Sequence, residues 1–243
     1  MILAILQGRL SSTRLPGKVL EPVLGEPMIV RQIERLCRSN SIDRLVVATS
    51  TDVSDDPLVA ELERRGIEVR RGPLNDVVSR FEQIASELRP GTIVRLTADC
   101  PLADAAVIDR VIDSHLESGS DYSSNTLHPT YPDGLDVECI SSGAFERMVH
   151  LPLTQREREH VTLGIYGRPE VFSLNSVTQD QNQSNLRWTV DVPDDLEFVR
   201  AVYSQLYDED NGFDQAAILS LLARRPDLNR TEHDLARNAG LGQ

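Results

Sequence analysis

Short apolar runs alternate with amphipathic stretches over the first two-fifths of the chain, and this alternation restricts the possible folds most strongly. Residues 2–6, 45–50, 67–70 and 92–97 have the short, apolar or β-branched pattern of strands. Residues 27–38, 57–65 and 76–88, which lie between them, place apolar side chains at helical spacing. A regular strand–helix order favours a parallel sheet with helices on both faces. The sequence therefore predicts a single three-layer α/β/α domain with a mostly parallel, Rossmann-like sheet.

The pattern is less regular after Asp99. Its periodicity predicts helices at 105–116, 142–148, 155–166, 193–206 and 213–223, and strands at 135–140, 172–176 and 188–190. Residues 125–136 contain two prolines, one glycine and several polar residues, which is typical of a long functional loop. Because no repeat or linker divides the chain, we expect one domain over 1–225 and a polar C-terminal tail over 226–243.

The charge of the chain narrows the choice of partners. Its net charge is −13, from 38 acidic and 25 basic residues. Such a surface repels nucleic-acid phosphates and anionic lipids, so we expect neither a nucleic-acid nor a membrane partner. The apolar start lacks the basic leader of a signal peptide, and no apolar run approaches the roughly 20 residues that span a bilayer. Together with three widely spaced cysteines, Cys37, Cys100 and Cys139, this favours a cytoplasmic protein with free thiols.

A basic loop follows the first predicted strand. Residues 7–18 read Gln-Gly-Arg-Leu-Ser-Ser-Thr-Arg-Leu-Pro-Gly-Lys and lie at the carboxyl edge of the sheet, where open α/β folds bind ligands. Gly8 allows close backbone approach, and the loop carries Arg9, Arg14 and Lys18. These cations suit a triphosphate, because arginine forks onto phosphate oxygens and lysine acts as a mobile charge. An ordinary basic surface loop remains the alternative, since the loop matches neither the Walker A motif nor the dinucleotide-binding G-x-G-x-x-G motif.

Two aspartates follow predicted strands at the same edge. Asp99 comes directly after the strand at 92–97, and Asp191 lies between the predicted strand at 188–190 and Pro193. Two such carboxylates could share one Mg2+, a hard cation that takes few protein oxygens together with phosphates and water. The alternative is that each carboxylate caps a turn or a helix.

A second polar group of residues lies further along the chain. Residues 131–138 read Tyr-Pro-Asp-Gly-Leu-Asp-Val-Glu, in which Asp136 and Glu138 alternate with apolar residues and so share one face of a strand. They could line a substrate site or form a solvated acidic loop. Arg158 and His160 could contact an anionic group, or could belong to an exposed helix face with ion pairs. His160 is also a candidate base.

Together these segments resemble one known family. The loop pattern Gly-Arg-x-x-Ser-Thr-Arg-Leu-Pro-Gly-Lys is followed, in order, by RLTADCPL at 95–102, YPDGLDVE at 131–138, REHVT at 158–162 and RWTVD at 187–191. The five blocks resemble those of the cytidylyltransferases that make CMP-activated acidic sugars, including the CMP-Kdo and CMP-sialate synthetases. The chain is most similar to the branch of the spore coat polysaccharide biosynthesis protein F (SpsF).

The resemblance implies a nucleotidyltransferase that moves CMP from CTP to a hydroxyl of a Kdo- or nonulosonate-like acidic sugar, with release of pyrophosphate, for cell-surface polysaccharide synthesis. It implies Mg2+ held by Asp99 and Asp191, catalytic roles for Lys18, Arg14 and Asp99, and a homodimer formed through the 125–169 region. The nucleotide-binding residues that it implies are Gln7, Gly8, Arg9, Ser11, Ser12, Thr13, Arg14, Lys18, Arg80, Thr97 and Ala98. Those implied for the acceptor are Tyr131, Asp133, Asp136, Glu138, Arg158 and His160.

Some positions depart from the family pattern. Gly8 stands where the family more often has alanine, and Ala98 where it more often has glycine. Both are small, so we expect close backbone approach to CTP to be kept. Leu163 and Gly164 stand where the related branch tends to have a proline and an aromatic residue. This departure concerns the identity of the acceptor more than that of the nucleotide. The alternatives are a nucleotidyltransferase for a sugar or polyol phosphate, and a non-catalytic nucleotide-binding domain.

Overall fold

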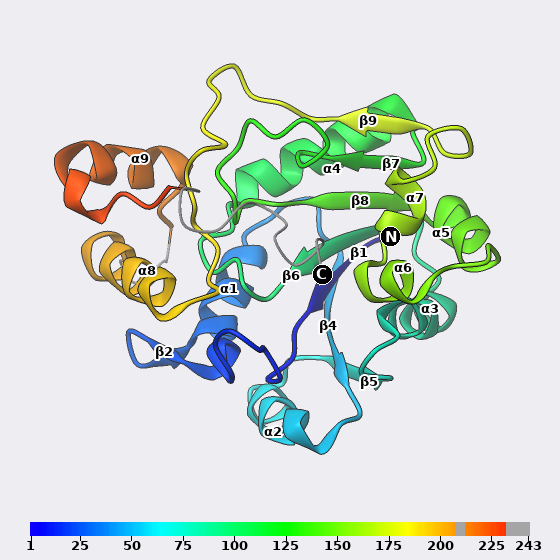
Figure 1. Ribbon diagram of the computed structural model, residues 1–243, viewed down its shortest axis with the longest axis horizontal. Helices are drawn as coiled ribbons and strands as arrows, with labels where there is room; N and C mark the ends of the chain where they lie inside the picture. Colours follow the sequence, from blue (N-terminus) through cyan, green and yellow to red (C-terminus); the bar gives the residue numbers. More distant parts are fainter. Residues whose placement is uncertain (208–211, 232–243) are drawn as a thin grey trace.

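Seven strands form one sheet in the computed structural model, which describes residues 1–207 and 212–231 (Figure 1). In chain order the strands are β1 (Ile2–Gln7), β4 (Arg44–Ser50), β5 (Val69–Gly72), β6 (Thr92–Thr97), β7 (Tyr122–Ser124), β8 (Glu138–Ser141) and β9 (Leu174–Ser176). Their spatial order is β5-β4-β1-β6-β8-β7-β9, and β8 is antiparallel to both its neighbours while the other pairs are parallel. The predicted α/β fold with a mostly parallel sheet is confirmed. A small ribbon of β2 (Pro22–Val23) and β3 (Glu26–Pro27) lies outside this sheet.

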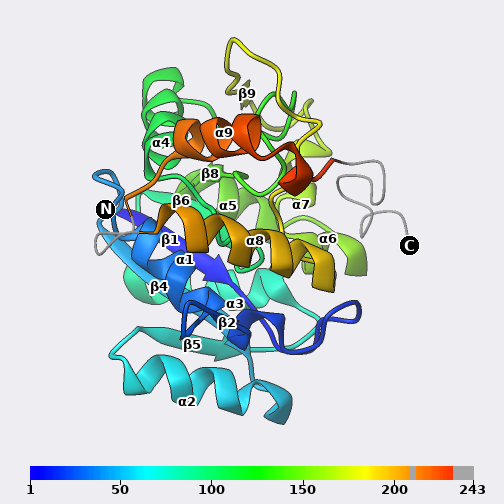
Figure 2. The ribbon, with the colours of Figure 1, turned by 90° about the vertical axis from the view of Figure 1, so that its left-hand side faces the viewer.

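Helices cover both faces of the sheet and make three layers. They are α1 (Met28–Leu36), α2 (Asp56–Arg64), α3 (Val77–Leu88), α4 (Ala105–Ser118), α5 (Ser142–Val149), α6 (Gln155–His160), α7 (Leu163–Tyr166), α8 (Pro193–Leu206) and α9 (Gln215–Arg224). Side chains of β1 alternate between two cores: Ala4 and Leu6 pack with α1, α2, α4, α8 and α9, whereas Leu3 and Ile5 pack with α3, α5 and α7. Figure 2 looks onto the face that carries α1, α8 and α9. Within the two described ranges, no helix is both long enough and apolar enough to cross a membrane.

The centre of the sheet determines where a ligand can bind. Strands β1 and β6 pair in parallel, with Gln7 opposite Thr97 at their carboxyl ends. The pairing continues one step further, since the Ala98 N–H donates to the Gln7 carbonyl at 2.8 Å. The loops that follow β1 and β6 therefore start side by side. This is the edge at which open α/β sheets bind ligands.

The second half of the sheet differs from the prediction in several places. Residues 188–190 do not form the predicted strand, because their donors bond to loops: the Trp188 N–H to the Asp133 carbonyl at 2.6 Å and the Val190 N–H to the Asp99 carbonyl at 2.8 Å. Strand β8 begins only at Glu138, since the Asn125 side chain bonds Leu135 and Val137 instead. Strand β7 was not predicted, because Tyr-Ser-Ser is short and mostly polar.

The predicted helix at 155–166 is interrupted at Val161. This buried β-branched residue has φ +44°, so it separates α6 from α7. A left-handed conformation at such a residue costs about 1–3 kcal/mol, and strain of this kind concentrates at functional sites. Its neighbours His160 and Thr162 both line the cleft described below.

The boundary at 225 stays a prediction. Beyond it, the structure describes a 3-10 turn, η3 (Pro226–Leu228), and an antiparallel bridge between Thr231 and Leu186. The remainder of the predicted tail, residues 232–243, lies outside the described residues.

Candidate active site

Two adjoining cavities open at the carboxyl ends of β1 and β6. The smaller, of about 240 Å³, lies against the 7–18 loop, and we call it the loop lobe. The larger, of about 440 Å³, lies over β6, β8 and the 126–136 segment, and we call it the sheet lobe. Four residues line both lobes, so the two form one continuous cleft: Arg14, Thr97, Asp99 and His160.

The loop lobe brings together nearly all of the predicted nucleotide-binding residues. Those that line it are Gln7, Gly8, Arg9, Ser12, Thr13, Arg14, Lys18, Arg80, Thr97 and Ala98, and Ser11 alone of the predicted set does not. Val19, Val77, Asp99, Glu159 and His160 complete the lining. Arg9 approaches Glu159 at 3.4 Å, so α6 closes one side of this lobe. The lobe thus combines backbone, hydroxyl and cationic donors, which is the chemistry that a polyphosphate requires.

A buried aspartate that sequence reasoning did not assign to the site holds the loop in place. Asp55 is fully buried, and its Oδ1 accepts the Leu10 N–H at 2.7 Å. Its Oδ2 accepts the N–H of Ser50, at the end of β4, at 3.1 Å, and also the Ser50 hydroxyl. Asp55 lies at the N-cap position of α2, but its side chain does not cap that helix. The contact joins residues 45 positions apart, which no local pattern indicates.

The start of the loop packs closely against the end of β6. A Cβ built on Gly8 would lie 2.8 Å from the Ala98 Cβ, which is closer than real Cβ contacts come. Only one of these two positions can therefore carry a side chain. The two departures from the family pattern, Gly8 and Ala98, are one reciprocal exchange across the β1–β6 pair.

Lys18 lies at the junction of the two lobes. Its ammonium donates to the Val190 carbonyl at 2.6 Å, to Asp191 Oδ1 at 3.0 Å and to Asp99 Oδ2 at 3.4 Å, so all three of its donors have partners. Burial opposes its charge, but Asp99 and Asp191 outweigh this and raise the pKa of Lys18. Burial likewise opposes the charge of Asp99, yet Lys18 lowers the pKa of that carboxyl below its ordinary value. Lys18 and Asp99 are therefore both charged at neutral pH.

Lys18 is also the single lysine of the chain, among 25 basic residues. A compact ammonium fits between two carboxylates and a carbonyl, whereas a planar guanidinium does not present its donors in that arrangement. All the remaining residues in this count are arginines. The lysine at this one position therefore indicates a geometric requirement for an ammonium.

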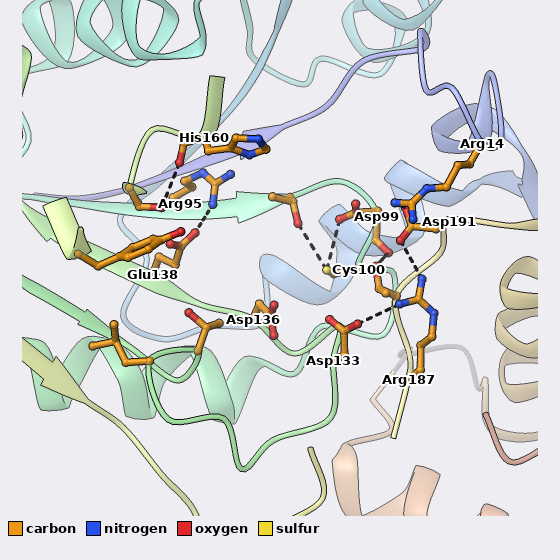
Figure 3. Close-up of a pocket in the computed structure, with 16 residues that line it drawn as sticks. Arg14, Arg95, Asp99, Cys100, Asp133, Asp136, Glu138, His160, Arg187 and Asp191 are labelled. Carbon is orange, nitrogen blue, oxygen red and sulfur yellow. Dashed lines mark hydrogen bonds and ion pairs between the residues drawn. The ribbon is translucent and has the colours of Figure 1, made fainter. Parts of the chain in front are cut away.

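The two predicted metal carboxylates meet at this ammonium. Figure 3 shows Asp99 and Asp191 close to each other in the cleft. Asp191 is also bonded by Arg14 at 2.9 Å and by Arg187 at 2.8 Å. In the described part of the chain, no cluster of three or more His, Cys, Asp or Glu side chains could hold a metal ion. The pair nevertheless fits Mg2+, because both carboxylates reach one shared cation position and Mg2+ commonly takes one or two carboxylates together with phosphates and water.

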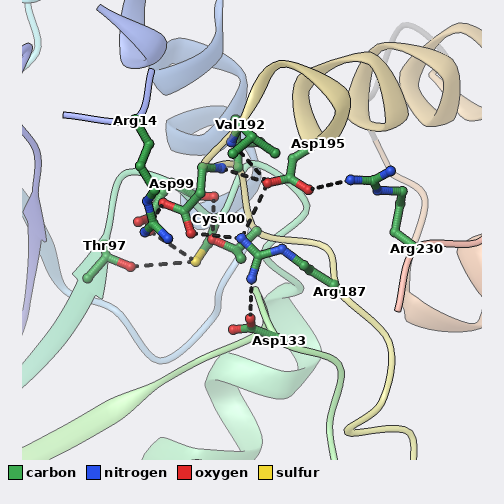
Figure 4. Close-up of polar contacts among 12 residues, drawn as sticks. Arg14, Thr97, Asp99, Cys100, Asp133, Arg187, Val192, Asp195 and Arg230 are labelled. Atoms are coloured by element: carbon green, nitrogen blue, oxygen red, sulfur yellow. Dashed lines mark hydrogen bonds and ion pairs between the residues drawn. The ribbon is translucent and has the colours of Figure 1, made fainter. Parts of the chain in front are cut away.

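Arg187 joins Asp191 to the rest of the sheet lobe. Its buried guanidinium bonds Asp191 at 2.8 Å (Figure 3), and it also bonds Asp133 at 3.1 Å and Asp195 at 3.3 Å (Figure 4). Burial opposes its charge, but the hydrogen bonds to Asp191 and Asp195 raise the pKa of Arg187. Sequence reasoning quoted Arg187 in a motif but gave it no role. Its position four residues before the proposed metal carboxylate Asp191 was the feature of the sequence that could have indicated this role.

The predicted acceptor residues divide into two groups. Asp133, Asp136, Glu138 and His160 line the sheet lobe, as Figure 3 shows. Tyr131 is 2% exposed and does not line the lobe. Arg158 does not line it either, because it pairs at 2.8 Å with Asp76, the N-cap of α3.

Arg95 is a further lining residue that sequence reasoning left without a role. It forms an ion pair with Glu138 and donates to the Gln7 side chain at 3.3 Å, while the Tyr122 hydroxyl donates to Glu138 at 2.7 Å. Burial opposes the charge of Arg95, but Glu138 raises its pKa. Glu138 is thus held between two partners, Arg95 and Tyr122.

The titration of the remaining groups limits the chemistry of the cleft. Burial raises the pKa of the Cys100 thiol well above its ordinary value, so this thiol stays protonated and is not an activated nucleophile. Burial lowers the pKa of His160, so its imidazole is neutral at pH 7 and can accept a proton. The cleft is therefore equipped to neutralise anionic charge and to position two ligands, one in each lobe.

Comparison with known proteins agrees with this arrangement. The model of the cytidylyltransferase family matches residues 3–218, a range that contains every residue lining the cleft. The spore coat polysaccharide biosynthesis protein SpsF of Bacillus subtilis is 32% identical over 233 residues, which is 93% of this chain and 95% of that protein. The 3-deoxy-manno-octulosonate cytidylyltransferase of Geobacter metallireducens is 32% identical over 114 residues, 46% of this chain and 43% of that enzyme.

A solved structure is similar over nearly the same length. A cytidylyltransferase from Leptospira borgpetersenii superposes with a TM-score of 0.88 at 27% identity, covering 93% of this chain and 95% of that one. The family model and the SpsF relative both extend over almost the whole chain. On this evidence the chain belongs to the cytidylyltransferase family.

Proposed function

We propose that this protein transfers CMP from CTP to a hydroxyl of an acidic sugar and releases pyrophosphate. The observation that carries the proposal is the convergence of Lys18, Asp99 and Asp191 where the two lobes meet. A nucleotide in the loop lobe and an acceptor in the sheet lobe would approach each other at this point. Family membership supports the cytidylyl chemistry, and the Geobacter relative, named for an acidic sugar, supports the acceptor class.

The loop lobe would bind the triphosphate. Arg9, Arg14 and Lys18 bring three positive charges to a protein whose net charge is −13, so a phosphate chain finds its counter-charge there. Their present partners, Glu159, Asp191 and Asp99, hold these side chains near the lobe before the nucleotide arrives. Asp55 fixes the loop backbone beneath them.

Asp99 and Asp191 would hold Mg2+, which when bound neutralises phosphate charge and helps to orient the phosphates. The protein's own groups would do the rest by positioning and charge. The acceptor oxygen would bond to the α-phosphorus as the bond to the bridging oxygen breaks, and pyrophosphate would leave. Lys18 and Arg14 would offset the charge that develops on the phosphates, while the neutral His160, which lines both lobes, could take the acceptor proton.

The sheet lobe would hold the acceptor. Asp133, Asp136 and Glu138 offer oxygens that accept hydrogen bonds from sugar hydroxyls. Arg14, Arg95 and Arg187 border the same space and offer donors to an anionic group. The lobe therefore suits a small polar molecule that carries several hydroxyls and one negative charge.

We also propose a cytoplasmic location and a homodimer formed through the 125–169 region, both on family resemblance. The SpsF relative, named for spore coat polysaccharide biosynthesis, supports a role in the synthesis of a cell-surface polysaccharide. Light scattering after size-exclusion chromatography measures the oligomeric state directly.

The acceptor is tested by product formation. The purified protein is incubated with CTP, Mg2+ and a panel of 3-deoxy-2-keto sugar acids, neutral sugars and sugar phosphates, and CMP-linked products are identified by mass spectrometry. We expect a product from one acidic sugar and none from the sugar phosphates. A product formed only from a phosphate-bearing acceptor would contradict the proposed acceptor class.

Lys18 variants test the proposed mechanism. Because all three donors of the ammonium are engaged, Lys18→Arg should reduce kcat/KM for CTP nearly as much as Lys18→Gln, by about 100-fold or more. Arg225→Lys, at an exposed ion pair with Asp227, is the matched control and should retain full activity. If Lys18→Arg were as active as the wild type, the ammonium-specific geometry would be wrong.

A further inference from the structure

The segment after η3 returns to the cleft from the far end of the chain. The Arg187 N–H donates to the Arg230 carbonyl at 3.0 Å, and Leu186 and Thr231 form an antiparallel bridge. Figure 4 shows the Arg230 side chain approaching Asp195 from the side opposite Arg187. Arg230 and Thr231 are thus held beside Arg187, the arginine that bonds the proposed metal carboxylate Asp191.

Arg230 is linked to the residues of the cleft through the buried carboxylate of Asp195. Its Nη2 lies 3.4 Å from Asp195 Oδ1, and its Nη1 lies 3.7 Å from Asp194. The Asp195 side chain is only 1% exposed, whereas that of Arg230 is 25% exposed. A carboxylate as buried as Asp195 needs protein donors and cations as partners, because water cannot reach its oxygens.

The other oxygen of Asp195 sets the backbone at Asp191. Asp195 Oδ2 accepts the N–H of Asp191 at 2.9 Å and the N–H of Val192 at 3.1 Å, as well as the Arg187 guanidinium at 3.3 Å. The position of Asp195 therefore fixes the turn from which the Asp191 carboxylate projects. A displacement of Asp195 would move both the Asp191 backbone and the arginine that orients its side chain.

The charges in this group show what a second cation adds at Asp195. Arg187 is shared among three carboxylates, those of Asp133, Asp191 and Asp195, of which Asp191 also pairs with Arg14 and Lys18. Arg230 adds a positive charge on the side of Asp195 that Arg187 does not reach. With Arg230 in place, Asp195 is held from both sides, and the donors of Arg187 remain shared with Asp133 and Asp191.

We propose that the C-terminal segment 226–231 is a positioning element of the active site, which acts through Arg230 and Asp195 to hold Asp191 in the orientation for metal and nucleotide. The inference rests on the proposed function, since it concerns the carboxylate assigned there to Mg2+. Arg230 is a positioning residue, because it touches neither the cleft nor the two proposed metal carboxylates.

The test compares Arg230→Gln with Arg230→Lys and with the control Arg225→Gln. All three variants keep the backbone bond from Arg187 to residue 230, so they isolate the side-chain charge. Arg225 lies five residues earlier and pairs only on the surface with Asp227, where both side chains are about half exposed or more. Mn2+ affinity in the presence of CTP is measured by electron paramagnetic resonance, and amide exchange over residues 188–196 by mass spectrometry.

Arg230→Gln should weaken Mn2+ binding by about threefold to tenfold, at or below the lower end of the range for direct partners of metal ligands. It should also speed amide exchange at 191–192, and Arg230→Lys should restore most of both properties. The inference is overturned if Arg230→Gln matches Arg225→Gln in affinity and exchange. If the wild type itself binds no Mn2+, the proposed metal site fails and the inference fails with it, a result distinct from failure of the variant alone.

Discussion

Replacing Gly8 by alanine should damage the protein through a single contact. The added Cβ would lie 2.8 Å from the Ala98 Cβ, whereas ordinary contacts begin at 3.4 Å, so the two backbones must separate by about 0.6 Å. Ala98 cannot turn away, since its Cβ is fixed to a backbone that bonds β1 through the Gln7 carbonyl. Overpacking of this kind costs about 1–3 kcal/mol. The separation would also move the loop that carries Lys18 away from Asp99.

The reciprocal change should repair this damage. In the double variant Gly8→Ala with Ala98→Gly, one Cβ again occupies the shared space, so most of the lost free energy of unfolding should return. Ala98→Gly alone should cost about 1 kcal/mol or less, mainly through backbone freedom. Gly91→Ala is a matched control, because the nearest atom to its added Cβ is the Met1 carbonyl oxygen, 3.8 Å away.

The assay is urea unfolding of the four variants and the wild type, together with CTP-dependent pyrophosphate release. We expect Gly8→Ala to lose both stability and activity, and the double variant to regain both. The reasoning would be refuted if Gly8→Ala were as mild as Gly91→Ala, or if the double variant were no better than Gly8→Ala.

Two further changes test how the cleft is supported. Asp55→Asn should cost about 1–3 kcal/mol and raise KM for CTP, because its amide nitrogen would replace one of the two oxygens that accept from the Leu10 and Ser50 N–H groups, and that nitrogen cannot accept. An unchanged urea midpoint would contradict this role. Glu157 bonds Arg168 and the Thr154 cap at the start of α6, and the Arg168 hydrogen bond lowers its pKa from 4.5 to about 2. Its stabilisation is complete above pH 4.5 and is lost as the pH falls toward 2, so Glu157→Gln should reduce the slope of stability in this range, measured by urea midpoints between pH 7 and pH 3. An equal slope in the variant would show that Glu157 is not responsible.

The first half of the fold could be predicted because its signals are local. Strand β6 has the predicted bounds, and β1 and β4 differ from the prediction by one residue each. The agreement is close because the apolar run of each strand is followed by a polar loop. Parallel topology then places the loops after β1 and β6 together. For this reason Lys18 and Asp99, far apart in the sequence, could be assigned to one site without a structure.

The rest of the site depends on contacts that no periodicity reveals. Residues 188–190 look like a strand, yet they run along the Asp99 and Asp133 turns and bond to those loops instead. The helical pattern near Arg158 does not reveal which face meets the cleft, and the structure directs that arginine to Asp76. The two ion pairs of Asp195, one with Arg187 and one with Arg230, join segments that come together only in the folded protein.

Pyrophosphate release with CTP, ATP, GTP and UTP, each with and without Mg2+ and across a panel of acidic sugars, tests the central claim most directly. The account predicts release that requires CTP, Mg2+ and one acidic sugar together. Release with another nucleotide in preference to CTP would contradict the proposed activity. Silence across the panel, with no binding of CTP by calorimetry, would show that the cleft does not serve the chemistry proposed for it.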